Sequence, residues 1–258
     1  MKDIRKYIFI LLALYFCSYL AKLDLFSQNE PDSDEKATEI TIPPHLQAAR
    51  ELLDGVLPEN NSYRHRPSVV LFKGEKGSDK YVCHTDCSGL IDGLFAYTYG
   101  YTPQEFRKWT GKRRAISSSY FRTISRGFGF TNILNIHDVL PGDLISYKLP
   151  PGSKNFGHVM IVDEKPTQHK SEPPLVPDTT QWAVTVIDCT GRGHGLQDTR
   201  YLGDGKFHSG IGRGVIRLYA SSEGELVGFA WSFLPKEKFY DTKSRPLVIG
   251  RLIPSFHP

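Results

Sequence analysis

The chain has 258 residues, of which 40% are hydrophobic and 12% aromatic, as in an ordinary globular protein with a packed core. Its 32 basic and 28 acidic side chains are interspersed and leave a formal net charge of +4. This balance gives no support to nucleic-acid binding, whereas an anionic partner such as a cell envelope is compatible with it.

Residues 1–27 have the organisation of an export signal. The basic segment MKDIRK precedes the apolar run YIFILLALYFCSYLA, and Lys22 and Asp24 interrupt this run. It therefore falls short of the roughly 20 apolar residues of a spanning helix, and we expect a cleaved signal peptide. An uncleaved N-terminal membrane anchor is the alternative, because no small-x-small cleavage site follows. Residues 28–42 are expected to be a linker, and the protein to be exported to a periplasmic or extracellular location.

The folded domain is expected over residues 43–258, and its first half carries helical patterns. A first helix is predicted where Pro44 suits the first turn and apolar residues recur at helical spacing, namely Leu46, Ala49, Leu53 and Val56. Residues 60–80 are rich in Arg, Lys, Gly and Ser and are expected to be irregular.

The segment CHTDCSGLIDGLF, residues 83–95, opens the second predicted helix. Thr85 or Asp86 can cap this helix, which puts Cys87 in its first turn. Apolar residues share one of its faces: Leu90, Ile91, Leu94 and Phe95. A capping box predicts a shorter helix at 102–109, and SSSYFRTIS is expected to add another.

From Asp138 onward the pattern changes to short β-like runs separated by Gly, Pro and Ser. These runs are DLISYKL, HVMIVDE, WAVTVID, GVIRLYA, LVGFAWSFL and PLVIGRLI. Helices followed by strands indicate an α+β domain in which helices pack on an antiparallel sheet. The glycine-rich residues 191–214 have no strand-loop-helix context for phosphate binding and are expected to be a long surface loop that lines the site.

Cys87 is the candidate nucleophile. A thiol at a helix N-terminus faces unpaired backbone N–H groups and the positive end of the helix dipole, which stabilise its thiolate. A small buried apolar residue is the structural alternative. A zinc site is a second alternative, because residues 83–87 hold four potential ligands. A separated ligand pair is missing unless Cys189 and His194 form it, so no metal is expected.

His158 is the candidate base. It opens the run HVMIVDE, and the expected hairpin partner WAVTVID ends in Asp188. If Asp163 lies opposite Ala183, antiparallel pairing puts His158 opposite Asp188, on one face with Met160, Val162, Val184 and Val186. Asp188 can then orient the imidazole as the third member of a triad. The alternatives are a solvent-facing His–Asp pair and His84 as the base, although His84 lies before the helix and has no fixed direction.

Three cysteines follow the N-terminal Cys17, too few for a disulfide framework: Cys83, Cys87 and Cys189. An odd number in an oxidising compartment leaves at least one free thiol or an intermolecular pair. Cys83 and Cys189 flank the proposed nucleophile and the proposed third residue, so a bond between them is one hypothesis, and two unrelated thiols are the other.

Three sequence blocks together resemble the NlpC-type cell-wall peptidases of the papain-like cysteine superfamily. They are DCSGLI at 86–91, LPGDLISY at 140–147 and GHVMIV at 157–162, in the order found in that family. The similarity covers about residues 44–190 and leaves a strand-rich C-terminal extension. It implies a papain-like NlpC-type domain, with the nucleophile at the start of an N-terminal helix that packs on an antiparallel β-sheet.

The resemblance also implies roles for individual residues. Cys87 is the nucleophile, His158 the general base and Asp188 the third polar residue, where many members of the family have a histidine. Tyr63, in NNSYRHRP, stands where the family has a tyrosine near the site, although the usual glycine-rich continuation is absent. Asp86 and Ser88, on either side of the nucleophile, are implied to bind substrate. The long segment WTGKRRAISSSYFRTISRGFGF is expected to roof or narrow the cleft.

The expected function is that of an exported cysteine hydrolase that cleaves amide bonds in peptidoglycan stem peptides, or in another peptide or amide substrate, through a thioester and without cofactor. Two alternatives remain at this point: an acyltransferase of the same superfamily, and a catalytically silent muropeptide-binding module. Nucleic acid is not expected as a partner, and a membrane is expected only through an N-terminal anchor. The oligomeric state is not predicted.

Overall fold

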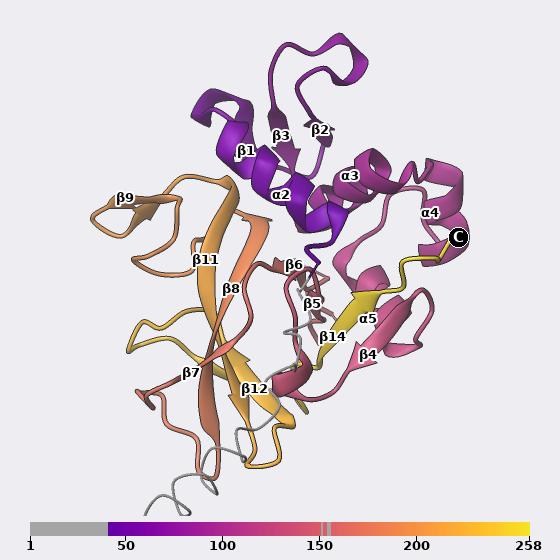
Figure 1. Cartoon of the computed structure of the whole chain (residues 1–258). Coiled ribbons are helices and arrows are strands. Elements are labelled where there is room, and N and C mark those ends of the chain that lie inside the picture. The colour runs from indigo at the N-terminus through magenta and orange to yellow at the C-terminus, as the bar shows by residue number, and fades with distance from the viewer. Residues whose placement is uncertain (1–40, 151, 154–155) are drawn as a thin grey trace, which may run out of the picture. The chain divides into compact units, whose positions relative to one another are not determined.

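The structure, a computed structural model, describes residues 41–150, 152–153 and 156–258 (Figure 1). The expected signal peptide or anchor (1–27) and nearly all of the expected linker (28–42) lie outside these residues, so export stays a prediction. Within the described ranges, no helix is long and apolar enough to cross a membrane. Residues from Ile42 to Pro258 form one compact unit.

The helices follow the predicted patterns. They are α2 (Pro44–Gly55), α3 (Cys87–Tyr99), α4 (Pro103–Thr110) and α5 (Ser117–Ser125), and α3 and α4 begin at the predicted caps. Asp86 is the N-cap of α3 and accepts a hydrogen bond from the Gly89 N–H, and Gly100 ends the helix at φ 71°. The capping box between Thr102 and Glu105 is present at the start of α4.

All six β-like runs predicted after Asp138 form strands. They are β5 (Leu144–Tyr147), β6 (His158–Val162), β8 (Thr180–Thr190), β11 (Gly210–Ala220), β12 (Leu226–Ala230) and β14 (Leu247–Leu252). The large sheet also contains β4 (Phe130–Ile133), β7 (Thr167–His169) and β13 (Phe239–Asp241), and a separate hairpin contains β9 (Tyr201–Gly203) and β10 (Lys206–Phe207). These additional strands have two to four residues, too few for a period-2 pattern to predict them.

The large sheet has the strand order β13-β12-β11-β8-β6-β5-β14-β4, and all of its pairings are antiparallel. β8 and β11 are its longest strands and pair along their whole length. One edge of β8 is shared, because β7 pairs with its first half and β6 with its second half. The second half of β8, which contains Asp188, is therefore brought beside β6, which begins at His158.

Residues 60–80 are not irregular throughout, as had been expected. They contain β1 (Asn61–Tyr63) and β2 (Val69–Leu71), which flank β3 (Val82–Thr85) in a small sheet. β1 runs parallel to β3, with Tyr63 opposite Thr85, and β2 runs antiparallel to it. This sheet holds the chain directly before Cys87 and brings Tyr63 to the start of α3. Figure 1 shows it with α2 at one end of β8 and β11.

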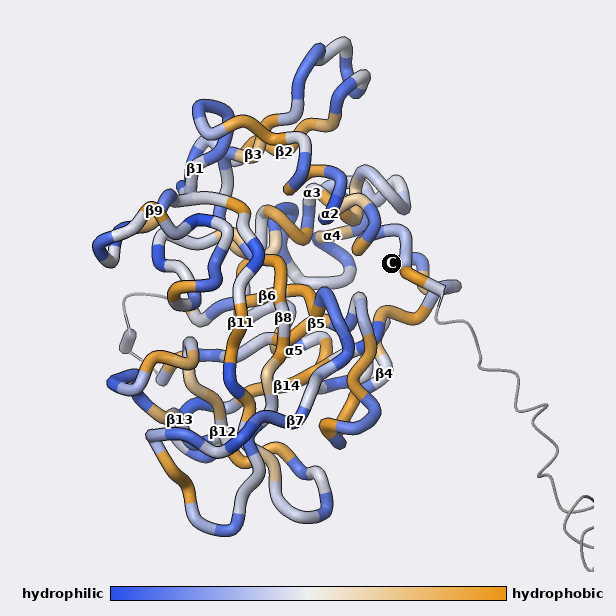
Figure 2. Tube along the Cα trace, turned by 60° about the vertical axis from the view of Figure 1, so that its left-hand side comes forward, coloured by the Kyte–Doolittle hydropathy of each residue, from blue (hydrophilic) through white to orange (hydrophobic). Residues whose placement is uncertain are grey.

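Two hydrophobic clusters occupy the two faces of the large sheet. The first contains residues of α2, α3 and α5 together with Val159 and Ile161 of β6. The second contains Met160 and Val162 of β6 and residues of β5, β8, β11, β12 and β14, without any residue of α2 to α5. Residues outside the strands, Ile136, Val139 and Trp231, also belong to this second cluster. Figure 2 shows the hydrophobic stretches along these central strands, with hydrophilic residues in the connections. The described chain is thus a mixed helix and sheet structure with mostly antiparallel strands.

Candidate active site

Cys87 is the first residue of α3. The Asp86 carboxylate caps this end of the helix through the Gly89 N–H at 2.9 Å and also accepts a hydrogen bond from Ser88 Oγ at 3.0 Å. Cys87 is 5% exposed and lines a pocket. The sulfur therefore lies where backbone N–H groups at the helix start are available to a negative charge.

His158, the first residue of β6, contacts both other members of the expected triad. Its Nε2 lies 2.5 Å from Asp188 Oδ2. The Cys87 thiol is within hydrogen-bonding reach of the same ring, which leaves Nδ1 as the nitrogen that faces it. The side chains of Tyr147 and Trp231 pack beside the imidazole, with the Trp231 ring centroid at 5.1 Å. The structure thus brings Cys87, His158 and Asp188 together in this order.

The register expected between the two strands is wrong by two residues. Val162, not Met160, lies opposite Val186. Because side chains alternate with a period of two, a shift of two residues leaves every side chain on its expected face. Met160, Val162, Val184 and Val186 accordingly share one cluster, and His158 reaches Asp188 diagonally.

The charges around His158 favour its protonated form. Burial by itself lowers the pKa of this residue, but the charge of Cys87 and the hydrogen bonds to Asp188 and Cys87 outweigh burial and raise the pKa to about 10. Asp188 is fully buried. Burial raises the pKa of its carboxyl, yet the cationic partners Arg200, His194 and His158 hold it well below its usual range. The buried Asp188 carboxylate on one ring nitrogen and the Cys87 sulfur near the ring therefore favour the protonated imidazole.

The pocket in front of Cys87 has a volume of about 480 Å³ and includes the three predicted substrate-binding residues, Tyr63, Asp86 and Ser88. Asp188 does not line it and lies behind His158. Burial, with the charges of Cys87 and Asp86, raises the pKa of Tyr63 well above its ordinary value, so its hydroxyl stays protonated and can donate a hydrogen bond. Apolar side chains also line the pocket: Ile116, Leu149, Phe156 and Trp231.

Two cationic side chains that were not predicted bind Asp86 at the edge of this pocket. Arg114 Nη2 lies 2.6 Å from Asp86 Oδ1, and His65 Nδ1 lies 2.8 Å from Oδ2. Burial raises the pKa of Asp86, but these partners and the Gly89 N–H outweigh it and lower the pKa. Arg66 also lines the pocket, and no acidic residue besides Asp86 does so among the described residues. The two arginines Arg66 and Arg114 therefore outnumber the one carboxylate in the lining, and these charged groups are cationic overall.

Arg114 is held in place through α3. Asp92, one turn after the nucleophile, accepts hydrogen bonds from the Ala115 N–H at 2.8 Å and from the Tyr120 hydroxyl at 2.6 Å. Burial raises the pKa of Asp92 to about 7, against the lowering effect of these bonds. The segment after α4 is thereby fixed over the pocket. This agrees with the expectation that the long insertion narrows the cleft, since Arg114, Ile116 and Ser117 line it.

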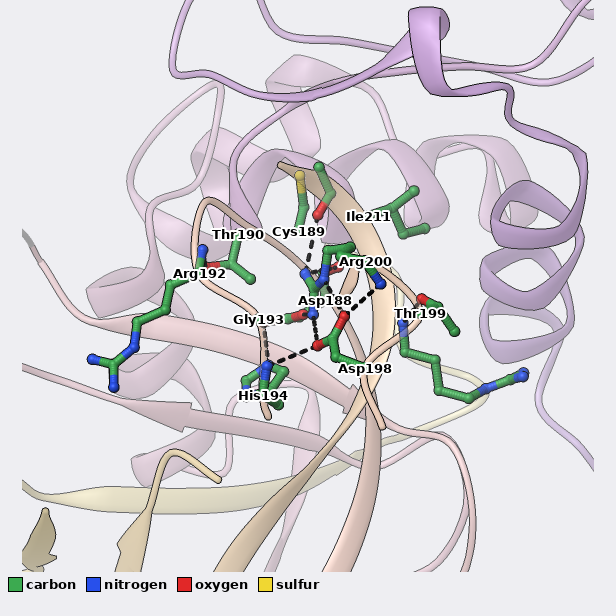
Figure 3. A network of polar contacts seen from close by, with 12 residues as sticks. Asp188, Cys189, Thr190, Arg192, Gly193, His194, Asp198, Thr199, Arg200 and Ile211 are labelled. Carbon is green, nitrogen blue, oxygen red and sulfur yellow. Dashed lines mark hydrogen bonds and ion pairs between the residues drawn. The ribbon is translucent and has the colours of Figure 1, made fainter. Parts of the chain in front are cut away.

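The glycine-rich residues 191–214 are not only a surface loop, as had been expected. They supply His194, Asp198 and Arg200, which are all at least 96% buried and lie behind Asp188 (Figure 3). Their polar composition and eight glycines suggested exposure. Gly212 and Gly214 instead belong to β11, where the absence of a side chain leaves room for the buried groups. Glycine within a strand often marks such a close approach, and this signal could have indicated the arrangement.

The competing interpretations of the cysteine segment find little support in the geometry. No group of three His, Cys, Asp or Glu side chains in the described ranges is arranged to hold a metal ion. His84 bonds Ser62 Oγ at 2.8 Å and does not line the pocket. Cys83 and Cys189 are buried and near each other, but both are free thiols, so the structure does not contain the disulfide hypothesised between them. Cys189 Sγ donates to the Thr85 carbonyl at 3.2 Å.

Comparisons with known proteins yield one informative relative. No protein-family model matches the chain, and no solved structure matches it significantly. The chain is 32% identical over 222 residues to "Uncharacterized protein R653" of Acanthamoeba polyphaga mimivirus, which covers 81% of this chain and 96% of that protein. The matched part is nearly the whole of the relative. The chain therefore belongs to the same family as this mimivirus protein.

Proposed function

We propose that the protein is an NlpC-type cysteine hydrolase that cleaves amide bonds in peptidoglycan stem peptides. The observation that carries this proposal is the arrangement at the pocket: Cys87 at a helix N-terminus, His158 with one nitrogen toward the sulfur, and Asp188 on the other nitrogen at 2.5 Å. Nucleophile, base and orienting group in this order are the parts that covalent acyl transfer requires.

The proposed reaction proceeds through a thioester. The Cys87 sulfur attacks the carbonyl carbon, and the backbone N–H groups at the start of α3 stabilise the negative oxygen. His158 donates its proton to the departing nitrogen, so that the C–N bond breaks and a free amine leaves. The neutral imidazole then takes a proton from water, which attacks the thioester and releases the carboxylic acid and the Cys87 sulfur. Asp188 holds the ring and stabilises the imidazolium.

Two features of the pocket support a peptide substrate with free carboxylates, which stem peptides of peptidoglycan have. Arg66 and Arg114 supply cationic groups, and the carboxylate of Asp86 offsets only part of their charge. Leu149 and Phe156, which also line the pocket, are suited to the aliphatic part of a side chain. The resemblance of the three sequence blocks to cell-wall peptidases and the predicted export signal support the same substrate.

The test is to incubate the full chain with purified muropeptides and to determine the masses of the products, with Cys87→Ala as the control. Hydrolysis adds one water to the substrate mass and divides it between two fragments, and the control should leave the substrate intact. Repeating the reaction with an added amine separates the alternatives, because an acyltransferase forms an amine adduct. Muropeptides that bind without any cleavage would overturn the proposed hydrolase in favour of a binding module.

A further inference from the structure

Asp188 has more partners than a triad requires. Besides His158, its carboxylate contacts His194 Nε2 at 3.0 Å and Arg200 Nη2 at 2.9 Å (Figure 3). The Arg200 contact is an ion pair without the alignment of a hydrogen bond, because Asp188 Oδ1 accepts no hydrogen bond. Neither His194 nor Arg200 lines the pocket in front of Cys87. Substrate in that pocket therefore does not touch them. Both contact Asp188, and His194 also packs on Trp231, with the ring centroids 4.3 Å apart.

The two partners are themselves held on their far sides. His194 Nδ1 lies 2.9 Å from the Trp231 carbonyl oxygen. Both nitrogens of His194 thus face acceptors, and the ring can donate to both only with a proton on each. Arg200 forms a bidentate pair with Asp198 at 2.8 and 2.7 Å. These bonds leave His194 and Arg200 little freedom to turn away from Asp188.

Strand β11 is shaped to accept this cluster. Gly212 lies opposite Asp188 in the sheet, and a Cβ at that position would be 2.4 Å from Arg200 Nε. A Cβ at Gly214 would be 2.5 Å from Asp198 Oδ2 and 2.7 Å from His194 Cβ. Contacts this short do not occur, so only glycine at both positions lets the buried groups approach the strand.

We propose that His194 and Arg200 are positioning residues of the reaction, which hold the Asp188 carboxylate in the orientation that fixes the His158 ring against Cys87. The inference rests on the proposed function. Without these partners, the Asp188 side chain could rotate about its bonds, and the orientation that contacts His158 Nε2 would be only one of several orientations. With Oδ2 shared between His158 and His194, and Oδ1 beside Arg200, one orientation remains.

Two substitutions of His194 separate its contacts. In His194→Asn the amide nitrogen can replace Nδ1 and keep the bond to the Trp231 carbonyl, but nothing reaches Asp188. In His194→Gln the amide nitrogen can replace Nε2 and keep the bond to Asp188. The measurement is the rate at which iodoacetamide alkylates Cys87 between pH 5 and 9, followed by mass mapping of the Cys87 peptide. An ordinary thiol, with a pKa of about 8.5, reacts slowly at pH 6, whereas a thiolate paired with an imidazolium reacts readily.

We expect His194→Asn to reduce the alkylation rate at pH 6 by roughly 10- to 100-fold, the range observed when a partner behind an oriented metal-ligating histidine is removed. His194→Gln should restore most of the rate. A purely structural role would lower the melting temperature of both variants and leave the pH profile of the folded protein unchanged. A folded His194→Asn with the native profile, or equal losses in both variants, would overturn the proposal.

Arg200→Lys provides a second test of the proposal if His194→Asn does not fold. Lysine keeps a cation beside Asp198, but a single ammonium cannot replace the guanidinium fork that spans Asp198 and Asp188. A reduced rate at pH 6 supports the proposal, and the native rate overturns it for Arg200. Failure of the proposed function is recognised separately, because the unsubstituted protein would then show the profile of an ordinary thiol.

Discussion

Gly157, the residue before His158, offers a direct test of how the base is positioned. Its φ is 118°, in the range that side chains other than hydrogen rarely adopt. A Cβ at this position would be 2.0 Å from the Tyr147 carbonyl oxygen and 2.9 Å from Lys148 Cα. Tyr147 is the residue opposite His158 in the pairing of β5 with β6. Gly157→Ala therefore forces apart the two strands at the catalytic end of the sheet.

The size of the displacement follows from these distances. A contact of 2.0 Å has to lengthen to at least about 3.0 Å, the lower limit of real Cβ contacts, so backbone atoms must move by about 1 Å. The strained φ adds about 1–2 kcal/mol. With the disrupted pairing, we expect a total loss of roughly 3–5 kcal/mol in the free energy of unfolding. A displacement of about 1 Å at His158 should reduce cleavage by roughly 100-fold.

Gly152→Ala is the matched control. Gly152 lies in the same connection between β5 and β6 and has a φ of 83°, but no atom would lie within 4 Å of its Cβ. This variant should lose only the conformational part, about 1 kcal/mol. Thermal unfolding by circular dichroism and the rates of muropeptide cleavage and Cys87 alkylation are compared for the two variants. If Gly157→Ala matches Gly152→Ala in both stability and rates, the geometric reasoning is refuted.

Cys87→Ala should abolish cleavage and change the melting temperature little, because alanine suits a helix first turn; residual turnover would contradict the nucleophile assignment. Asp188→Asn should lower the melting temperature by roughly 6–20 °C, since removing one partner of a buried ion pair costs about 3–5 kcal/mol and each kcal/mol corresponds to about 2–4 °C. The exposed Glu164→Gln is its control and should change the melting temperature by less than about 2 °C. Because the pKa of His158 is raised from 6.5 to about 10, its protonation stabilises the fold fully below pH 6.5, and this contribution is lost as the pH rises through about 10. Unfolding measured against pH should show that loss in the unsubstituted protein and not in His158→Gln, and cleavage should fall over the same alkaline range.

Helix positions and the location of the nucleophile could be predicted from the sequence because the interactions that determine them are local. Asp86 caps α3 through a residue three positions away, and the Thr102–Glu105 capping box spans the same distance. The strand runs after Asp138 are long enough for their apolar pattern to be recognised. The short strands β1 and β4 could not be found, because each pairs with a strand far away in the chain.

The register between β6 and β8 could not be predicted from the hydrophobic pattern. A shift of two residues keeps every apolar side chain on its face, so the hydrophobic pattern is equally satisfied by the expected and the observed registers. Only packing in three dimensions selects between them. The prediction that His158 meets Asp188 held despite the wrong register, because a diagonal neighbour is still within reach of an imidazole.

The surroundings of the triad were decided by the tertiary structure alone. Arg114 and His65 converge on Asp86 from segments 28 and 21 residues away, and His194 and Arg200 reach Asp188 from a stretch whose glycines and polar residues suggested a surface loop. The sequence by itself identified Cys87 and His158 as candidate nucleophile and base, and each begins an element, whereas Asp188 was identified from the pairing of its strand with that of His158. Which charges surround them depends on long-range packing, because a buried carboxylate takes whichever cations the fold brings near it.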